Sequence, residues 1–521
     1  IFISLLIVMI AFLCIRFALL TKLEEEVHEI GVMKAIGLQH NEIKKIYLVK
    51  YTMLSALGCI LGWIFAMIYS DVIMVDMRNH FGTSLNASKA PVIGAVGSIA
   101  IFVIIILFVL HTLSYLRKIS VLQALRFGTL EMKGVTNSFF SLYKINRMNP
   151  NLFLSIKDIL GRKKLYFTLL IVFLLSTFIM IVPQNLSDTI SSKEFIRYMG
   201  VGKSDIRLDM KQSSTMSDSL ERAELYLSED KEVQKFVILT TAKYKMINKQ
   251  GEEIPVTTES GDHQVFPVIY SEGKPPVRRE EVALSELNSK ELQVGIGDNI
   301  SIIQNGIRKD FHVCGIYSDI TNGGKTAKIT QQSGENTDNM GSIIYIQTSD
   351  NAVPETVSDK YAKRFPDSKV SDMKEYMYQT FGDTMKSVAK ASVITMYLAL
   401  GIMVLVTVLF LNMLIAKDGY SISVLKAVGF SNRDIKIQYT IRLCLIFVLG
   451  SLSGLVLANT LGESTVGFVI SSFGAGSFQF ESDPLKSLLF SPALMFGAIL
   501  VSTMLGTKEI DKKKIADHIR E

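Results

Sequence analysis

The sequence predicts a polytopic α-helical membrane protein that carries an α+β domain outside the bilayer. Three observations lead to this fold class. Seven apolar runs approach or exceed the roughly 20 helical residues that cross a bilayer. A motif in residues 29–37 returns in residues 421–429, at an offset of 392 residues. Between the fourth and fifth runs, residues 184–390 hold no apolar stretch of spanning length.

Composition agrees with this class. A mean hydropathy of +0.32 with 49% hydrophobic residues is typical of a membrane protein that carries one sizeable polar insert. Three of the four cysteines (Cys14, Cys59 and Cys444) fall inside apolar runs, and Cys314 is alone in the polar region. The sequence therefore predicts no disulfide framework.

The repeat extends beyond its motif. The first copy reads Glu29-Ile30-Gly31-Val32-Met33-Lys34-Ala35-Ile36-Gly37, and the second reads Ser421-Ile422-Ser423-Val424-Leu425-Lys426-Ala427-Val428-Gly429. The same offset relates Ile43, Lys44 and Tyr47 to Ile435, Lys436 and Tyr439, and the pair Gly58 and Gly62 to Gly450 and Gly454. A repeat of this length indicates two related units. We expect the four glycines to serve helix packing, because small residues let helix backbones approach closely in lipid.

The predicted elements follow in order along the chain. The spans are residues 1–20, 48–74, 91–116, 165–183, 391–416, 440–460 and 488–506, with Pro183 closing the fourth. The domains are 1–116 with three spans, 117–163 as a cytoplasmic linker, 164–183 as one span, 184–390 as the α+β domain, and 391–521 with three spans and a basic tail. By the offset Ile1 matches Val393, so we expect a counterpart of residues 151–392 upstream of Ile1.

Local patterns support these assignments. In the linker, an apolar stripe lies opposite Lys157, Arg162 and Lys163, which predicts an amphipathic helix on the membrane surface. The stripe comprises Leu152, Phe153, Ile156, Ile159 and Leu160. In the α+β domain, β-branched alternations at 235–239 and 310–317 predict strands, and glycine-rich turns separate such segments.

Charge asymmetry predicts the orientation. Loops 21–47, 117–163, 417–438 and 507–521 carry twenty-two Lys and Arg, whereas loops 75–90 and 461–487 carry three. By the positive-inside rule the first group is cytoplasmic, so residues 184–390 are extracytoplasmic. Topology thus accounts for the net charge of +6 without a nucleic-acid partner.

The repeated motif is suited to docking. Its apolar positions would leave exposed surface on an isolated helix: Ile30, Met33, Ala35 and Ile36, with Ile422, Leu425, Ala427 and Val428 in the second copy. Gly37 and Gly429 suit a helix end, where a left-handed residue closes the last turn. Such a helix fits a groove on another protein. The alternative is a solvated loop.

The motif, followed by Ile43-Lys44-Lys45-Ile46-Tyr47 and a glycine-bearing span, resembles the FtsX-like permease domain of ABC transporters of the macrolide-exporter and lipoprotein-release type. The outer region is similar to that family's extracytoplasmic core at residues 272–276, 280–285, 294–298 and 311–317. The resemblance implies a bacterial plasma-membrane permease that works in the lipid bilayer with a separate ABC-type ATPase subunit. It places the ATPase-docking helices at Glu29, Gly31, Lys34, Ala35, Gly37, Lys426, Ala427 and Gly429. Ser421 and Ser423 depart from the family pattern.

Two functions follow from the resemblance. The first couples ATP hydrolysis in the partner to movement of the outer domain, for export or extraction of a lipophilic or peptide substrate. The second is mechanotransmission without transport, acting on a sensor kinase or a cell-wall hydrolase; an adaptor protein is a further candidate partner. A secondary transporter would need charges at the bilayer midplane. The spans offer only Asn412 and the end-placed Arg16, Asp71, His111 and Arg442, which disfavours that class.

No catalytic, metal or cofactor site is predicted. Gly202-Lys203-Ser204 lacks the first glycine of a phosphate loop, because Arg197 stands there. His28-Glu29 lacks the second histidine of a zincin pair, because Val32 occupies its position. His263 and His312 are isolated. The chain is therefore interpreted as a protein without an enzymatic site of its own.

Overall fold

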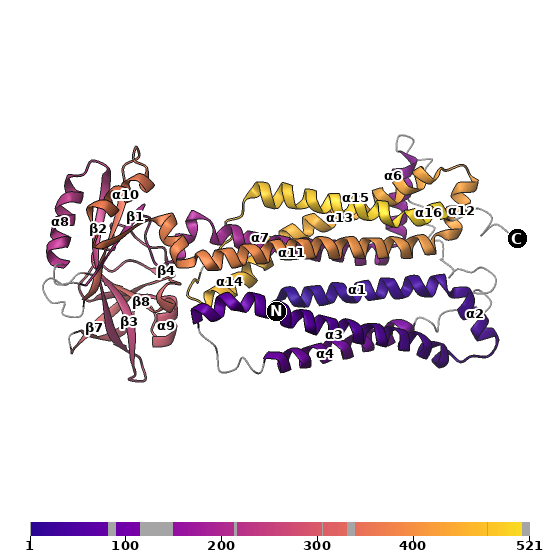
Figure 1. The fold of residues 1–521 in the computed structure, drawn as a ribbon, viewed down its shortest axis with the longest axis horizontal. Helices are drawn as coiled ribbons and strands as arrows, with labels where there is room; N and C mark the ends of the chain where they lie inside the picture. Colours follow the sequence, from indigo (N-terminus) through magenta and orange to yellow (C-terminus); the bar gives the residue numbers. More distant parts are fainter. Residues whose placement is uncertain are drawn as a thin grey trace. The chain divides into compact units, whose positions relative to one another are not determined.

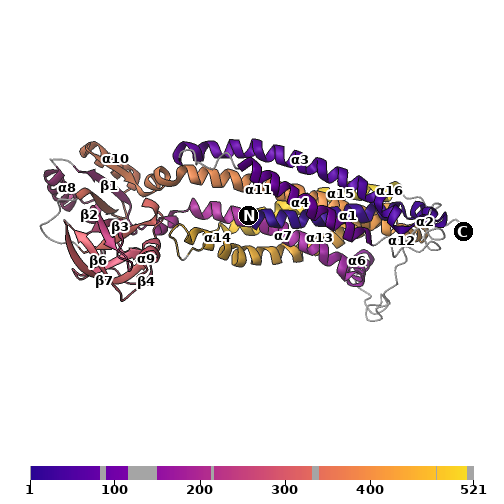
Figure 2. The same cartoon turned by 90° about the horizontal axis from the view of Figure 1, so that it is seen from below.

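The computed structural model describes residues 2–81, 90–114, 149–212, 216–304, 306–330, 339–476 and 478–512. The chain divides into two compact units. The membrane unit comprises residues 1–179, 397–454 and 492–521, and the sheet unit comprises residues 180–396 and 455–491. Figures 1 and 2 label the elements of both units.

Twelve of the described α-helices lie outside the region of the strands, and they range from five to 45 residues. They are α1 (Phe2–Glu25), α2 (Val27–Ala35), α3 (His40–Phe81), α4 (Ala90–Leu113), α6 (Pro150–Gly161), α7 (Lys163–Ile190), α11 (Met373–Lys417), α12 (Gly419–Ala427), α13 (Asn432–Leu457), α14 (Glu463–Ser471), α15 (Ser491–Gly506) and α16 (Lys508–Lys512). The π-helical turns η6 (Ala458–Gly462) and η7 (Lys486–Phe490) precede α14 and α15. Among the described residues, seven helical stretches are long and apolar enough to cross a membrane, and each overlaps a predicted span.

Several helices are longer than predicted. Pro183 does not close the fourth span, because it lies inside α7, which continues to Ile190. Helix α11 begins at Met373 rather than at residue 391. Asp372 caps this start, because its carboxylate accepts a hydrogen bond from the backbone N–H of Glu375 at 2.8 Å. Residues 463–471, predicted as loop, form α14. Apolarity marks only the bilayer-crossing part of a helix, whereas backbone hydrogen bonding continues through polar turns beyond it.

Each repeat of the membrane unit has its own packed interior. In the first repeat the buried side chains come from α1, α2, α3 and α4: Leu19, Leu23, Val27, Ile30, Ile43, Tyr47, Val109 and Leu113. In the second repeat α7 supplies the fully buried Leu169, Val172 and Phe173. The ring of Phe173 meets Phe447 of α13 edge to face at 5.8 Å.

The sheet unit is built on one mixed sheet. Its strands are β1 (Ile206–Lys211), β2 (Val233–Ile247), β3 (Glu253–Ser260), β4 (Tyr270–Gly273), β5 (Glu281–Ser285), β6 (Asn299–Gln304), β7 (Ile307–Tyr317), β8 (Thr326–Ile329), β9 (Asn339–Thr348) and β10 (Ser368–Asp372). They follow the order β10-β1-β9-β2-β3-β8-β5-β7-β4, with β6 pairing β2 and β7. The pairs β3–β8 and β5–β7 are parallel. The strands predicted at 235–239 and 310–317 are confirmed within β2 and β7.

Short helices cover the sheet. Helices α8 (Met216–Glu229) and α10 (Pro354–Arg364) pack on β1 and β9 through Leu208, Leu227 and Tyr361 (Figures 1 and 2). A separate cluster is formed by buried side chains of β2, β3, β5, β6, β7 and β8 together with Leu292 of α9 (Glu286–Leu292).

A third apolar cluster joins the sheet to the helix ends of its own unit. Phe195 and Tyr198 of the 3₁₀ helix η4 (Lys193–Tyr198), Met377 of α11 and Phe478 pack against Tyr345 of β9. Ala475, Phe478 and Phe480, which follow α14, are thereby held in this cluster.

Candidate functional site

The repeated motif forms a short helix in each copy, α2 and α12, of nine residues each. Gly37 and Gly429 end them with left-handed φ values of 98° and 104°, as predicted. The backbone N–H of Gly37 donates to the carbonyl of Lys34 at 3.2 Å, and that of Gly429 donates to Lys426 at 3.1 Å. These bonds satisfy carbonyls that a helix end would otherwise leave unpaired.

One apolar expectation for these helices is wrong. Ile30 and Ile422 were expected on an exposed face, but they are 0% and 1% exposed. They pack inward because this side of each helix faces the spans. Ile36 and Val428, which belong to the same predicted set, are 72% and 74% exposed, and Val32 and Val424 are 41% and 38% exposed.

The predicted docking residues do not all share one face. Glu29, Ala35, Gly37, Ala427 and Gly429 are exposed, and Gly31 is buried. Lys34 and Lys426 are half-buried. The ammonium group of Lys426 donates to the backbone carbonyl of Ile510 at 2.9 Å, so this lysine ties α12 to α16.

A hydroxyl–carboxylate pair lies at the start of both short helices. Tyr47 donates to the carboxylate of Glu26 at 2.5 Å, and Tyr439 donates to Asp418 at 2.8 Å. The 392-residue offset relates both members of the two pairs. Sequence reasoning missed the carboxylates because they differ, Glu in one copy and Asp in the other, although their common offset from the tyrosines was available.

The second copy adds a buried ion cluster. Arg162, which follows α6, lies 2.7 Å from Asp418 and 3.2 Å from Asp158. Arg442 of α13 lies 3.0 Å from Asp158 and 3.7 Å from Asp418. Tyr166 donates to Asp158 at 2.5 Å. Two arginines and two aspartates therefore join α6, α13 and the start of α12.

Helix α6 packs on α13 through polar side chains as well. Ser155 donates to the backbone carbonyl of Gln438 at 3.0 Å, and the amide of Gln438 donates to Asn151 at 3.0 Å. The helix predicted to lie on the membrane surface is thus anchored to the second repeat.

The first copy holds its carboxylate more loosely. Lys22 lies 3.0 Å from Glu26, with the two side chains 39% and 22% exposed. In the second copy the side chains of Arg442 and Asp418 are 9% and 5% exposed. Lys50 occupies the position equivalent to Arg442.

The pKa values of the two equivalent carboxyl groups, Asp418 and Glu26, are shifted in opposite directions. At Asp418, burial raises the pKa of the carboxyl against the opposing effect of Arg162. At Glu26, burial also raises the pKa, but the hydroxyl of Tyr47 and the ammonium of Lys22 outweigh it and leave the pKa lowered.

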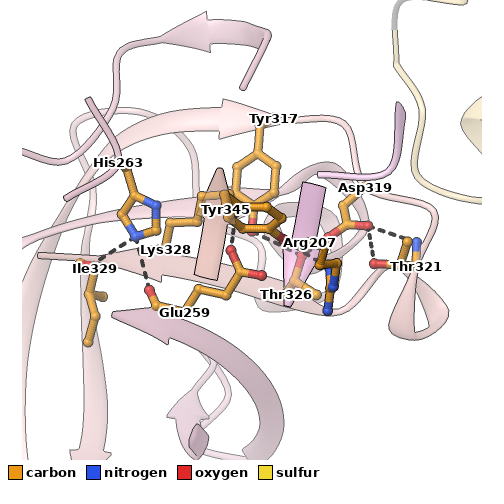
Figure 3. A network of polar contacts seen from close by, with 10 residues as sticks. All are labelled: Arg207, Glu259, His263, Tyr317, Asp319, Thr321, Thr326, Lys328, Ile329 and Tyr345. Atoms are coloured by element: carbon orange, nitrogen blue, oxygen red, sulfur yellow. Dashed lines mark hydrogen bonds and ion pairs between the residues drawn. The ribbon is translucent and has the colours of Figure 1, made fainter. Parts of the chain in front are cut away.

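The sheet unit contains a second polar cluster (Figure 3). Asp319 accepts hydrogen bonds from the backbone N–H and hydroxyl of Thr321 at 2.7 and 2.6 Å, and from the hydroxyl of Thr326 at 2.6 Å. Burial raises the pKa of Asp319 to about 6. Tyr317 donates to Thr326 at 3.0 Å.

The same cluster buries a histidine and an ion pair (Figure 3). Lys328 pairs with Glu259. Nε2 of His263 lies 3.1 Å from the backbone carbonyls of Glu259 and Ile329. Burial and the charge of Lys328 lower the pKa of His263 to about 4. These polar groups form their hydrogen bonds and their ion pair with one another. Such internal pairing is typical of a rigid core rather than of a reactive centre.

A loop of the second repeat contacts this cluster within the sheet unit. The backbone N–H of Asp319 donates to the carbonyl of Gly474 at 3.0 Å, and the N–H of Gly476 donates to the hydroxyl of Ser318 at 3.2 Å. A Cβ atom on Gly476 would overlap the carboxylate of Glu286. A side chain at this position would therefore require the carboxylate of Glu286 to move.

Comparison with known proteins relates two regions of the chain to one protein family. The family model described as "FtsX-like permease C-terminal" matches residues 1–121 and 393–515. The periplasmic region of MacB from Actinobacillus actinomycetemcomitans is 16% identical with a TM-score of 0.26, over 35% of this chain and 94% of that structure. A domain of a Porphyromonas gingivalis protein described as a permease is 11% identical with a TM-score of 0.21, over 34% and 90%. Among curated proteins, none matches this chain.

The two matched regions begin at equivalent positions of the repeat, Ile1 and Val393. Each contains one short helix, its glycine end and the glycine-bearing span that follows. Both copies of the repeated motif therefore lie in regions that match the FtsX-like permease domain.

Proposed function

We propose that this chain couples ATP hydrolysis by a separate ABC-type ATPase subunit to a conformational change of its sheet unit. The observation that carries the proposal is helix α11, which begins directly after β10 and ends one residue before Asp418. Its 45 residues form one continuous helix, about 68 Å long at 1.5 Å per residue. A displacement of α12 is thus passed along a single stiff element to the sheet.

The short helices α2 and α12 receive the force. Each presents a small exposed alanine beside an exposed branched side chain: Ala35 with Ile36, and Ala427 with Val428. An apolar patch of this kind fits a groove on the ATPase. The ion cluster around Asp418 holds α12 against α6 and α13, so we expect α12 to transmit force more stiffly than α2.

The orientation follows from the Lys/Arg asymmetry of the loops. It makes α2 and α12 cytoplasmic and the sheet unit extracytoplasmic, in the plasma membrane of a bacterium. The work done outside is export or extraction of a lipophilic or peptide substrate.

Mechanotransmission without transport is the second candidate, because a stiff α11 would serve it equally well. There the sheet unit would act on a sensor kinase or a cell-wall hydrolase. ATP-driven movement of a lipophilic peptide by the reconstituted complex supports export. An ATP-driven change in the sheet unit with no peptide movement supports mechanotransmission.

The docking role is tested by adding bulk to the exposed alanines. Ala35→Trp with Ala427→Trp should expel the ATPase, because overpacking a fitted contact costs about 1–3 kcal/mol per site. Such a cost weakens binding by roughly tenfold or more at each site. The single Ala35→Trp change should be the more severe, since the first copy keeps the fuller motif. The measurement is co-purification of the ATPase in detergent, together with its stimulated ATP hydrolysis.

The matched control is Leu225→Trp, which adds bulk at an exposed position of α8 in the sheet unit. It should leave co-purification unchanged. If the double tryptophan variant retains its ATPase, α2 and α12 are solvated connections and the docking role is wrong.

The orientation is tested by thiol labelling of intact cells. A single cysteine at Leu225, in a version without the native cysteines, should react with a membrane-impermeant reagent. A cysteine at Ala35 should react only after permeabilisation. The reverse pattern would overturn the orientation.

A further inference from the structure

One side of α6 is bonded to the second repeat. Asn151, Ser155 and Asp158 contact residues of α13. Arg162, which caps the end of α6, pairs with the carboxylate that precedes α12. Positions i, i+4, i+7 and i+11 lie on one side of a helix, so these four polar side chains form a single stripe. Their bonds fix how α6 is turned about its own axis.

The apolar residues of α6 lie away from that stripe. At about 100° per residue, Leu152, Ile156 and Leu160 are turned by about 100–180° from Asn151 around the helix axis. All three are half-buried, so part of each side chain is exposed. Figure 1 shows α6 running across the direction of α7. This is how a helix lies when it follows the surface of a bilayer and leads into a span.

Three exposed lysines lie at the junction of α6 and α7. Lys157 belongs to α6, and Lys163 and Lys164 begin α7. Residues 150–170 contain one carboxylate, that of Asp158, which is bonded to two arginines and a tyrosine. Among the described residues, none of the three lysines pairs with a carboxylate. Three cations within eight residues are therefore left for a partner outside the described chain.

The depth of these lysines follows from the span itself. The stretch of α7 that is long and apolar enough to cross a membrane begins at Lys163. Lys163 and Lys164 thus lie at the level of the lipid headgroups, where lysine side chains reach water at the end of a span. Phe167, one helical turn further into the span, is 61% exposed. Positive charge and exposed apolar surface therefore meet at one end of one helix.

We propose that α6 and the first turns of α7 bind the headgroup of an anionic phospholipid. The ammonium groups of Lys157, Lys163 and Lys164 bind its phosphate, and an acyl chain lies along Phe167. The opposite side of α6 is bonded to the start of α12 through Arg162 and Asp418. A lipid held here steadies α12 as well as α6.

An anionic phospholipid matches both parts of this surface. Clustered lysines at a membrane surface attract anionic headgroups, whereas phosphatidylcholine has no net charge to attract. An acidic protein surface would neutralise the lysines but would leave Phe167 without a partner inside the span. Free phosphate has no apolar part and leaves the same side chain uncovered.

Native mass spectrometry of the detergent-purified full chain, titrated with dioleoyl phosphatidylglycerol, tests this binding. One lysine beside an anionic lipid surface strengthens binding about fivefold. Changing Lys157, Lys163 and Lys164 together to glutamine should therefore weaken the tightest lipid site by roughly a hundredfold. The same three positions changed to arginine keep the charge and should bind as the wild type does.

The matched control removes three exposed lysines of the sheet unit: Lys243→Gln, Lys363→Gln and Lys369→Gln. It lowers the net charge equally and should leave the tightest site unchanged. Equal weakening in this control, or a tightest site that survives the junction triple, would overturn the proposal.

Competing ligands separate the possible sources of binding. Dioleoyl phosphatidylcholine should show no site of this strength, and inorganic phosphate should not displace phosphatidylglycerol. Equal binding of phosphatidylcholine, or displacement by phosphate, would overturn the proposal. A junction triple that keeps its lipid site but no longer co-purifies with the ATPase would assign the lysines to that subunit, with the same consequence.

Hydrogen exchange in nanodiscs locates the lipid. Exchange in α6 and α12 should be slower in phosphatidylglycerol than in phosphatidylcholine, with α8 as the unaffected reference. The glutamine triple at the junction should abolish this difference, and a difference that persists in that variant would refute the assignment. Both lipid measurements use the chain without its ATPase, so they are independent of the proposed function.

Discussion

Replacing Asp418 by alanine should loosen α6 and α12, whereas the equivalent change at Glu26 should have a small effect. The Asp418 side chain is 5% exposed and lies 2.7 Å from Arg162. Removing it leaves two arginines against Asp158 alone. Breaking a buried ion pair by removing one partner costs about 3–5 kcal/mol. Glu26 is 22% exposed and pairs with an exposed lysine, so its ion pair contributes about 1 kcal/mol or less.

Hydrogen exchange of the detergent-purified chain measures this difference locally. A loss of about 3–5 kcal/mol speeds exchange through local opening about a hundredfold to a few thousandfold in α6 and α12. Glu26→Ala should speed exchange in α2 by roughly tenfold or less, and α8 serves as the unaffected reference in both variants. Arg162→Ala combined with Asp418→Ala should be less than additive, because the residues share one interaction. Equal effects at positions 26 and 418, or an unchanged α6 in Asp418→Ala, would refute the reasoning.

Three further predictions concern the sheet unit, and the first two are measured by urea unfolding with pulse proteolysis at several pH values. In the folded protein the pKa of His263 is lowered to about 4, so the neutral ring contributes to the free energy of unfolding above pH 6.5. This contribution, about 3 kcal/mol, is lost as the pH falls from 6.5 through 4. The variant His263→Gln should not show this loss of stability. In the folded protein the pKa of Asp319 is raised to about 6, so the protonated carboxyl contributes to the free energy of unfolding below pH 3.8, and this contribution is lost as the pH rises through 6. The variant Asp319→Asn should remove this dependence on pH, which is also about 3 kcal/mol. For either residue, a variant whose stability follows the wild-type pH profile would contradict the prediction. Gly476→Ala should push the carboxylate of Glu286 aside at a cost of about 1–3 kcal/mol. This should be seen as faster exchange in residues 472–476, while Gly467→Ala, whose Cβ meets Phe478 at an ordinary 3.7 Å, should not speed it.

The residue pattern alone predicted the seven helical stretches that, among the described residues, are long and apolar enough to cross a membrane, although not their ends. Their apolar runs are a local property of the chain, because each span must satisfy its own backbone and present apolar side chains to lipid. The helix ends at Gly37 and Gly429 were equally predictable, since left-handed backbone favours glycine wherever it occurs. The strands within β2 and β7 followed from their alternation.

Only the tertiary structure decided what those elements contact. Ile30 and Ile422 belong to the same helical pattern as the exposed Ile36 and Val428, so the helix itself could not show which side faces the spans. The cluster around Asp418 joins residues 158, 162, 418 and 442, and no short-range spacing encodes such a meeting. The two glycine pairs are identical in sequence, yet one packs on α7 and the other lines a groove. Packing depends on which helix arrives from elsewhere in the chain, and that is a property of the assembled fold.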